Sequence, residues 1–333
     1  MKILYIFLLF LLTHSIVFPN DSRTVLGSTV MIVDDENTNI IMQEETINIT
    51  LHRDFYEVEV DFTFFNTGEA ETILLGFPVE AHIMNIPEEI AQEHIFDFRT
   101  YINSNLIPEY SVREDPPENL DPNGFYVKIR RWYLREVTFP ENEYTFSRVT
   151  YRSYYNYGGF FLSAGYIYGT GANWKDKIGR MTVLINHNDD ILINKISNLG
   201  VFTWEENGRY RFVRENFEPS ISSQISIGIQ KFDNRFGDIY EGWIWDRRLI
   251  YRDESDIRLF TRNQVRLFIN YFYAFHGYEF RNSYYRDFFS QAGRLDDENG
   301  TIYQINPNFS ENDFNEIERS NIDFLTRMER MIP

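Results

Sequence analysis

The amino-acid sequence predicts a multidomain protein that is mainly β, with an antiparallel β-sandwich region followed by a small α-helical module at the C-terminus. Two observations predict this fold class. Over residues 24–237, short runs of alternating apolar and polar residues are separated by turn residues, which is typical of half-buried antiparallel strands. In the last quarter of the chain, apolar residues recur with the longer period of an amphipathic helix. With 333 residues, the chain can form two or three domains.

The N-terminal segment 1–18 has the pattern of a signal peptide. Lys2 supplies a positive charge, and the ten residues Ile3–Leu12 form an unbroken apolar run. This run is too short for the roughly 20 residues that span a bilayer as a helix. No A-x-A sequence marks a cleavage site, so an uncleaved segment stays open as an alternative. We expect an exported protein that is periplasmic, bound to the cell envelope or secreted.

Composition and charge exclude several classes of site and partner. The chain has no cysteine, which excludes disulfides, thiolate metal sites and a cysteine nucleophile. Its net charge of −18 argues against nucleic acid, because affinity for nucleic acid depends on neutralising phosphates. The expected partners are cell-wall or envelope components or another envelope protein. Membrane contact is expected only through an uncleaved signal segment.

The clearest strand of the β region is Tyr56–Phe64. Its apolar residues fall on one face, whereas Glu57, Glu59 and Asp61 fall on the other. A turn at 66–69 leads into a partner strand at 72–77. Further strands are expected at 125–132, 144–151, 159–168, 180–186 and 224–231.

Two segments between these strands are rich in turn residues. The segment 113–124 contains three prolines and is expected to be a loop, either between two β lobes or within one. The glycine-rich segment Tyr168–Trp174 lacks the spacing of a phosphate-binding loop. We expect it to form a tight loop that places Trp174 in the core, with a ligand-contacting loop as the alternative.

The C-terminal module, predicted over 243–333, is marked by two capping boxes. Thr261 and Gln264 form the first, and Gly277 is suited to end the helix that follows. The expected apolar stripe of this helix is Val265, Phe268, Ile269, Phe272 and His276. Ser310 and Asp313 form the second capping box and are expected to open the last helix. The expected apolar face of that helix is Phe314, Ile317, Phe324, Leu325 and Met328.

The helix ends in Tyr-Ala-Phe-His-Gly at Tyr273–Gly277, with Asn270 three residues before the tyrosine. Over residues 259–330 this pattern resembles the YARHG domain, a small module of bacterial extracytoplasmic proteins. The resemblance implies an envelope protein and no particular chemistry, because that family has no established activity. Phe275 stands where the motif has arginine, and Ile269 replaces the usual basic residue before Asn270.

The motif supplies the candidate binding residues Asn270, Tyr273, His276, Gly277 and Tyr278. For three of these residues we favour a structural interpretation. His276 is expected to be a hydrogen-bonded structural residue, and Gly277 is expected to end the helix. Asn270 is expected to cap or cross-link backbone groups within the fold. Trp243 and Trp245 alternate and would share one face of a strand, where they could stack on a sugar ring if exposed. Burial against the helical module is the alternative that we favour for them.

The region 28–185 resembles an uncharacterised family of bacterial envelope proteins that carry β-sandwich ectodomains. The stretches that carry this resemblance are 51–54, 57–64, 66–68, 75–78 and 168–175. The resemblance implies a location rather than an activity. The six histidines show neither H-E-x-x-H nor H-x-H spacing, and there is no G-x-S-x-G motif. We therefore predict no catalytic residues, no metal site and no cofactor.

Three functions stay open from the sequence. The first, which the absent motifs favour, is a non-enzymatic envelope protein whose C-terminal module makes partner contacts. The second is an envelope hydrolase or a peptidase accessory, which a catalytic triad in a cleft would support. The third is a soluble ligand carrier, which an apolar cavity lined by tyrosine and phenylalanine would support.

Overall fold

The structure is a computed structural model. It describes residues 31–32, 38–82, 95–114, 128–158, 161–197, 199, 203–205, 209–220, 223–231, 259–290 and 303–332. The predicted signal segment, Trp243 and Trp245 lie outside the described residues. Strands occupy the described chain from Met31 to Lys231 and helices occupy it from Arg262 to Met331, which confirms the predicted fold class.

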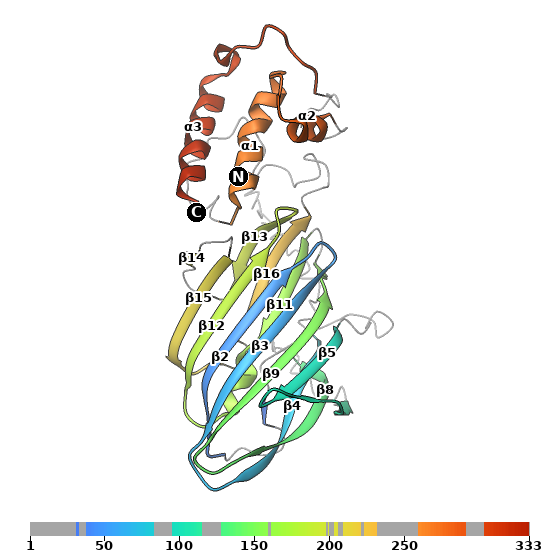
Figure 1. The fold of residues 1–333 in the computed structure, drawn as a ribbon, viewed down its shortest axis with the longest axis vertical. Coiled ribbons are helices and arrows are strands. Elements are labelled where there is room, and N and C mark those ends of the chain that lie inside the picture. The colour runs from blue at the N-terminus through green and yellow to red at the C-terminus, as the bar shows by residue number, and fades with distance from the viewer. Residues whose placement is uncertain are drawn as a thin grey trace, which may run out of the picture.

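One layer of the β region is an eight-stranded sheet, called here the large sheet (Figure 1). Every neighbouring pair of its strands is antiparallel except β12 and β2, which run parallel. In spatial order its strands are β14 (Thr203–Glu205), β15 (Arg209–Phe217), β12 (Ile178–His187), β2 (Ile40–Leu51), β3 (Phe55–Asn66), β9 (Tyr144–Tyr154), β5 (Ile95–Ile102) and β6 (Asn105–Ile107).

Two four-stranded sheets pack against the inner face of the large sheet. The β11 sheet contains β10 (Asn156–Gly158), β11 (Phe161–Ile167), β16 (Gln224–Lys231) and β13 (Ile191–Ser197). The β8 sheet contains β1 (Met31–Ile32), β4 (Glu71–His82), β8 (Lys128–Phe139) and β7 (Ser111–Glu114). All three sheets contribute to one hydrophobic core, so the β region is a sandwich with a divided second layer.

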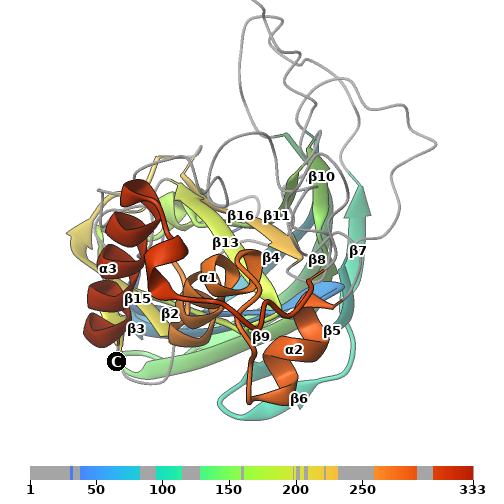
Figure 2. The ribbon, with the colours of Figure 1, turned by 90° about the horizontal axis from the view of Figure 1, so that it is seen from above.

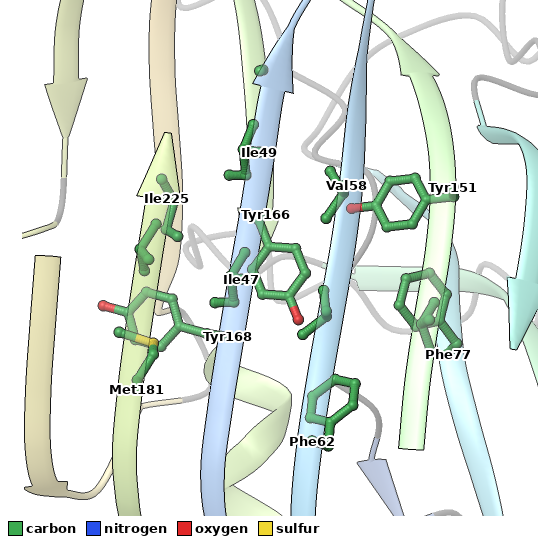
Figure 3. Close-up of a cluster of buried hydrophobic side chains, with 14 of the residues drawn as sticks. Ile47, Ile49, Val58, Phe62, Phe77, Tyr151, Tyr166, Tyr168, Met181 and Ile225 are labelled. Carbon is green, nitrogen blue, oxygen red and sulfur yellow. The ribbon is translucent and has the colours of Figure 1, made fainter. Parts of the chain in front are cut away.

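The core forms because the strands keep their period of two. In β3, the alternate residues from Tyr56 to Phe64 are at most 1% exposed, as the sequence predicts. Figure 3 shows Val58 and Phe62 of β3 beside Ile47 and Ile49 of β2. Aromatic side chains pack in the space between the layers. An apolar cavity in this space was the feature expected of a ligand carrier.

Polar contacts also join the two layers. The Tyr166 hydroxyl of β11 donates to Oε1 of the buried Glu45 on β2 at 2.9 Å. The Tyr56 hydroxyl of β3 donates to the carbonyl of Gly165 at 3.3 Å. These bonds satisfy polar groups that would otherwise be costly to bury, and they fix the β11 sheet over β2 and β3.

The glycine-rich segment after β11 forms the 3₁₀ turn η2 (Gly169–Asn173). Trp174 follows it, is 4% exposed, and has its ring centroid 4.4 Å from that of Phe64. The prediction that this loop places Trp174 in the core is confirmed. Its role in ligand contact stays untested.

Predicted strand positions are correct, but several bounds are wrong. The predicted strand 224–231 is β16, whereas the strand expected at 125–132 belongs to β8 and runs on to Phe139. The sequence analysis did not single out β2, β13 or β15, because their mixed polar residues obscure the alternation.

Four helical elements follow within the described residues: α1 (Arg262–Phe275), α2 (Ser283–Phe289), the 3₁₀ turn η5 (Glu311–Asp313) and α3 (Glu316–Met331). The capping box of Thr261 and Gln264 opens α1, as predicted. The prediction that Ser310 opens the last helix is wrong, because its capping box begins only the 3₁₀ turn η5. Phe314 is extended there, and α3 begins after Asn315, which forms its own capping box with Glu318.

The predicted apolar faces are largely confirmed. On α1 the residues Val265, Phe268, Ile269 and Phe272 are buried, and on α3 the residues Phe324, Leu325 and Met328 are buried. Phe314 is buried as well, although it precedes α3, whereas Ile317 is only partly buried.

The helices gather at one end of the sandwich (Figures 1 and 2). They meet it at the turn between β12 and β13, where Leu192 of β13 joins their hydrophobic cluster. Gln264 is 1% exposed and donates through Nε2 to the carbonyls of Asp189 and Ile191, at 2.9 and 2.8 Å. Within the described residues, none of the helices has the length and apolar character needed to cross a membrane.

Candidate functional site

The candidate site is a polar groove on the outer face of the large sheet. Residues of β2, β3 and β9 that do not enter the core point outward, because side chains alternate along a strand. The groove has a volume of about 500 Å³, within the usual range for a ligand site. It is lined by Asn48, Thr50, Glu57, Val58, Glu59, Asp97, Arg99, Thr150, Tyr151, Arg152 and Asn186.

A β-bulge in β5 shapes one side of this groove. The register between β5 and β9 shifts between Phe96 and Arg99, and Asp97 adopts a positive φ of 54°. Left-handed backbone costs an L-residue roughly 1–2 kcal/mol, although aspartate tolerates it better than most. In this conformation the Asp97 carboxylate accepts a hydrogen bond from Arg152 at 3.0 Å. Bulges occur often beside functional sites, where they redirect a side chain.

Strand register places the polar side chains in two neighbouring rows. The first, called the paired row, consists of Asn186, Thr50, Glu57, Arg152 and Asp97. Arg152 Nε donates to Glu57 Oε1 at 2.7 Å. Burial opposes ionisation of Glu57, but hydrogen bonds from His52 and Arg152 outweigh it and hold the pKa of this carboxyl below its ordinary value.

The second row, called the open row, consists of Asn48, Glu59, Thr150 and Arg99 on β2, β3, β9 and β5. Three strand spacings separate its ends, roughly 14 Å. The side chains of Asn48, Thr150 and Arg99 have no hydrogen-bonding or ionic partner among the described residues. Within the same described part of the chain, Glu59 has only a 3.9 Å contact with Arg148. The open row therefore presents amide, hydroxyl, carboxylate and guanidinium groups that are available to a ligand.

Exposed aromatic rings flank the polar rows at both ends of the outer face. At one end Phe96 contacts Tyr154, which is 51% exposed, with ring centroids 4.8 Å apart. At the other end Tyr144 and Phe146 are each 54% exposed and stack at 6.4 Å. Aromatic residues of this size are usually more buried, so their exposure suits contact with a ligand or partner.

The structure places four predicted motif residues together in the helical module. The Tyr273 hydroxyl donates to Glu311 at 3.2 Å, and the His276 Nε2 atom lies 3.0 Å from an oxygen of Glu318. Gly277 adopts a φ of 79° and accepts a hydrogen bond from the Asn306 amide at 2.8 Å. Tyr278 is 36% exposed, and its carbonyl accepts from the Tyr303 hydroxyl at 2.6 Å.

These contacts are internal to the module, so they support the structural interpretation of His276 and Gly277. The fifth candidate, Asn270, lies next to Tyr285, and its Nδ2 atom is buried with no partner among the described residues. Arg266 and Glu329 form an ion pair nearby, between α1 and α3. A binding role for the motif stays a prediction.

The sequence analysis missed the groove, although it identified Glu57 and Glu59 as outward-facing. A further signal of an outward polar face is the alternation of polar residues at 44, 46, 48 and 50. This signal is weak because Glu45 places a carboxyl group on the core face. Only the strand register brings Arg99 to Thr150 and Asn48 to Glu59. In the part of the chain that the structure describes, no three histidine, aspartate or glutamate side chains are placed to hold a metal ion.

Comparison with known proteins identifies a shared fold. No protein-family model and no curated protein sequence matches the chain. A solved structure of a "putative nutrient binding protein" from Legionella pneumophila matches 92% of this chain and 99% of its own, with a TM-score of 0.52 and 18% identity. At this identity the likeness establishes the fold alone.

Weaker likenesses involve a metallopeptidase and a hydrolase. An M1 zinc metallopeptidase from Deinococcus radiodurans has a TM-score of 0.32 and 10% identity, and the match covers 58% of this chain and 42% of that chain. Yeast LTA4 hydrolase has a TM-score of 0.29 and 9% identity, over 57% of this chain and 29% of that chain. These two likenesses carry no inference about activity.

Proposed function

We propose that this chain is an exported, non-enzymatic ligand-binding protein of the bacterial cell envelope. Its groove on the large sheet binds a small polyhydroxylated molecule that carries one acidic group, such as an acidic sugar. The observation that carries this proposal is the open row, whose polar groups lie side by side in a groove of about 500 Å³. Among the residues that the structure describes, these groups have no partner apart from the distant contact of Glu59 with Arg148. The shared fold with a protein described as nutrient binding supports the same conclusion.

The chemistry of the open row sets the ligand class. Asn48 and Thr150 can each donate and accept hydrogen bonds, as sugar hydroxyls require, and Glu59 accepts two more. Arg99 presents a planar guanidinium that matches a carboxylate or phosphate with two parallel hydrogen bonds. The exposed rings at Tyr154 and Phe146 offer apolar faces to the flanks of a longer ligand.

The paired row supports binding rather than catalysis. A general acid at neutral pH needs a raised pKa, whereas the pKa of Glu57 is lowered by His52 and Arg152 despite its partial burial. Ion pairs with Glu57 and Asp97 also hold Arg152 in place. The side chains of the paired row are therefore held in place, and they form one side of the groove beside the ligand that the open row contacts.

The helical module has a separate role in this proposal. Its resemblance to the YARHG domain and the predicted signal peptide together support an envelope protein whose C-terminal module contacts a cell-wall component or another envelope protein. The binding groove and the module lie on different parts of the molecule, so one can hold a ligand while the other holds a partner.

The experiment is a thermal-shift and calorimetric screen of the mature protein. The panel contains neutral sugars, uronic acids, sugar phosphates and dipeptides. We expect uronic acids or sugar phosphates to raise the melting temperature and neutral sugars to bind more weakly. Arg99→Met removes a charged hydrogen-bond donor worth about 1.5–3 kcal/mol and should weaken binding about 10- to 100-fold.

The matched control is Arg214→Met on β15, an exposed arginine outside the groove. It makes the same change on the same sheet and should leave the affinity unchanged. Equal losses in both variants would show that Arg99 acts only through the overall charge. Binding of dipeptides alone, or of no compound in the panel, would contradict the proposed ligand class.

A further inference from the structure

Three aromatic side chains on the outer face of the large sheet form a cluster beside the paired row. This aromatic cluster consists of Phe55 on β3, Phe96 on β5 and Tyr154 on β9. The Phe96 ring contacts the other two, with its centroid 4.8 Å from that of Tyr154 and 6.0 Å from that of Phe55. Phe55 and Phe96 are partly buried, whereas Tyr154 is 51% exposed. The cluster therefore presents the Tyr154 ring to solvent, with Phe96 packed against it.

The strand register places the aromatic cluster next to the groove. Phe55 and Tyr154 pair with each other across β3 and β9. Two residues further along the same strands, Glu57 pairs with Arg152, and both of these line the groove. The guanidinium carbon of Arg152 also lies 5.4 Å from the centre of the Phe55 ring. The aromatic cluster therefore continues the groove beyond the paired row.

The exposed rings of Tyr144 and Phe146, at the other end of β9, are separated from the groove. Between Phe146 and the open row lie Arg148 on β9 and its partner Asp61 on β3, which are bonded to each other at 2.6 Å. Neither of these two is among the described residues that line the groove. Of the two aromatic ends, the Tyr154 end is the one that is continuous with the groove.

The distance from the open row to Tyr154 is greater than the size of a single sugar. Thr150 of the open row and Tyr154 are four residues apart on β9, which corresponds to roughly 14 Å. The paired row lies between them and holds two carboxylates, Glu57 and Asp97, against the guanidinium of Arg152. The excess of carboxylate disfavours a second acidic group nearby. A ligand that reaches both places is therefore longer than one sugar unit and is uncharged at the Tyr154 end.

We propose that the aromatic cluster is a second subsite, in which the Tyr154 ring stacks on an uncharged sugar unit of an oligosaccharide. This inference rests on the proposed function, because the acidic unit of the same oligosaccharide occupies the open row at Arg99. One face of a sugar ring carries C–H groups that pack on an aromatic ring. Tyrosine suits this contact, since its ring is apolar while its hydroxyl stays hydrated. Phe96 limits the rotation of the Tyr154 ring, which lowers the entropy lost on binding.

The test compares ligands of increasing length by titration calorimetry with the mature full chain. The series contains a free uronic acid and the same uronic acid linked to one, two or three neutral sugars. We expect wild type to bind the longest members roughly 3- to 10-fold more tightly than the free acid, as one stacking contact allows. Tyr154→Ala should bind all four members with similar affinity. Tyr154→Phe should keep the gain with length, because it retains the ring.

The matched control is Tyr144→Ala, which removes a 54% exposed tyrosine from the same face of β9. It should keep the gain with length. The second subsite is overturned, and the proposed function is not, if wild type binds the free acid but gains nothing with length. An equal loss of the gain in Tyr144→Ala and Tyr154→Ala has the same meaning. If no member of the series binds to wild type, both the subsite and the proposed function are wrong.

A crystal structure of wild type with the longest member provides a second measurement that does not depend on the folding of Tyr154→Ala. We expect one uncharged sugar ring of that ligand to lie against the Tyr154 ring. A ligand that extends from the open row toward Phe146 instead, or whose neutral units contact no aromatic ring, would overturn the assignment.

Discussion

Gly277 shows at the scale of one residue how the helical module closes. Its φ of 79° ends α1, and a Cβ atom at this position would lie 2.6 Å from the carbonyl oxygen of Gln304 and 2.7 Å from Cβ of Asn306. Those atoms belong to the segment that crosses from α2 to α3. A side chain therefore meets both a strained backbone and a steric overlap.

We predict that Gly277→Val lowers the free energy of unfolding by about 2 kcal/mol or more, mainly in the helical module. Chemical denaturation followed by circular dichroism near 222 nm measures this. The comparison variant is His276→Gln, which removes the ring but keeps an amide that can donate to Glu318. The Glu318 carboxylate also stays bonded to the backbone amide of Asn315. His276→Gln should be destabilised less than Gly277→Val, and the reverse order would contradict the structural interpretation of the motif.

Glu57 provides a pH test at the same scale. Its pKa is lowered in the folded state from an ordinary value of 4.5. A group with a lowered folded pKa contributes stability above its unfolded pKa and loses it as the pH falls through the folded pKa. We predict that wild type loses more stability than Glu57→Gln as the pH falls from about 5 to 3, measured by urea denaturation. Glu218→Gln, which changes an exposed carboxylate, should follow wild type.

At the scale of elements, local sequence determined what could be predicted. The alternation of β3 and the capping box of Thr261 are signals within ten residues, and both predictions are confirmed. The true start of α3 was missed because Asn315 and Glu318 compete with an equally good capping box at Ser310. The groove could not be predicted, because Asn48 and Arg99 come to lie in one row only through the order and register of four strands.

Gln264 joins two elements, since it both caps α1 and holds the turn before β13. Its Oε1 accepts from the Thr261 amide, while its Nε2 donates to two carbonyls of that turn. Gln264→Glu keeps the capping acceptor but turns a buried donor into a charge that faces carbonyl oxygens. We predict a loss of about 2–4 kcal/mol in the full chain, measured by chemical denaturation.

The control for this prediction is Asn263→Ala. It removes one exposed hydrogen bond to Asp189 and should cost at most about 1 kcal/mol. If Gln264→Glu were as stable as this control, Gln264 would act only as a helix cap. The helices would then not depend on the turn for their position.

At the scale of the whole molecule, the helical module has a hydrophobic cluster made almost entirely of its own residues. Of the described residues buried in that cluster, Leu192 is the one that the β region supplies. We predict that a fragment 243–333 folds alone, with helical circular dichroism and cooperative melting. Its melting temperature should be lower than that of the module in the full chain, because the contacts of Leu192 and Gln264 are lost. A fragment without cooperative melting would show that the module needs the sandwich.

The whole molecule is divided into two units. The sandwich carries a polar groove on its outer face, while the helices form a second unit at one end. The aromatic-rich composition reflects the core, in which phenylalanine and tyrosine fill the space between the sheets. The net charge of −18 remains the basis of the prediction that nucleic acid is not a partner.

The position of a bound ligand tests the central claim most directly. A crystal structure of the protein with the tightest compound from the screen should show that compound across β2, β3, β9 and β5. We predict that its acidic group contacts Arg99 and that its hydroxyls contact Asn48 and Glu59. A compound bound instead at Tyr273 and Tyr278 in the helical module, or between the two layers of the sandwich, would contradict the assignment of the groove.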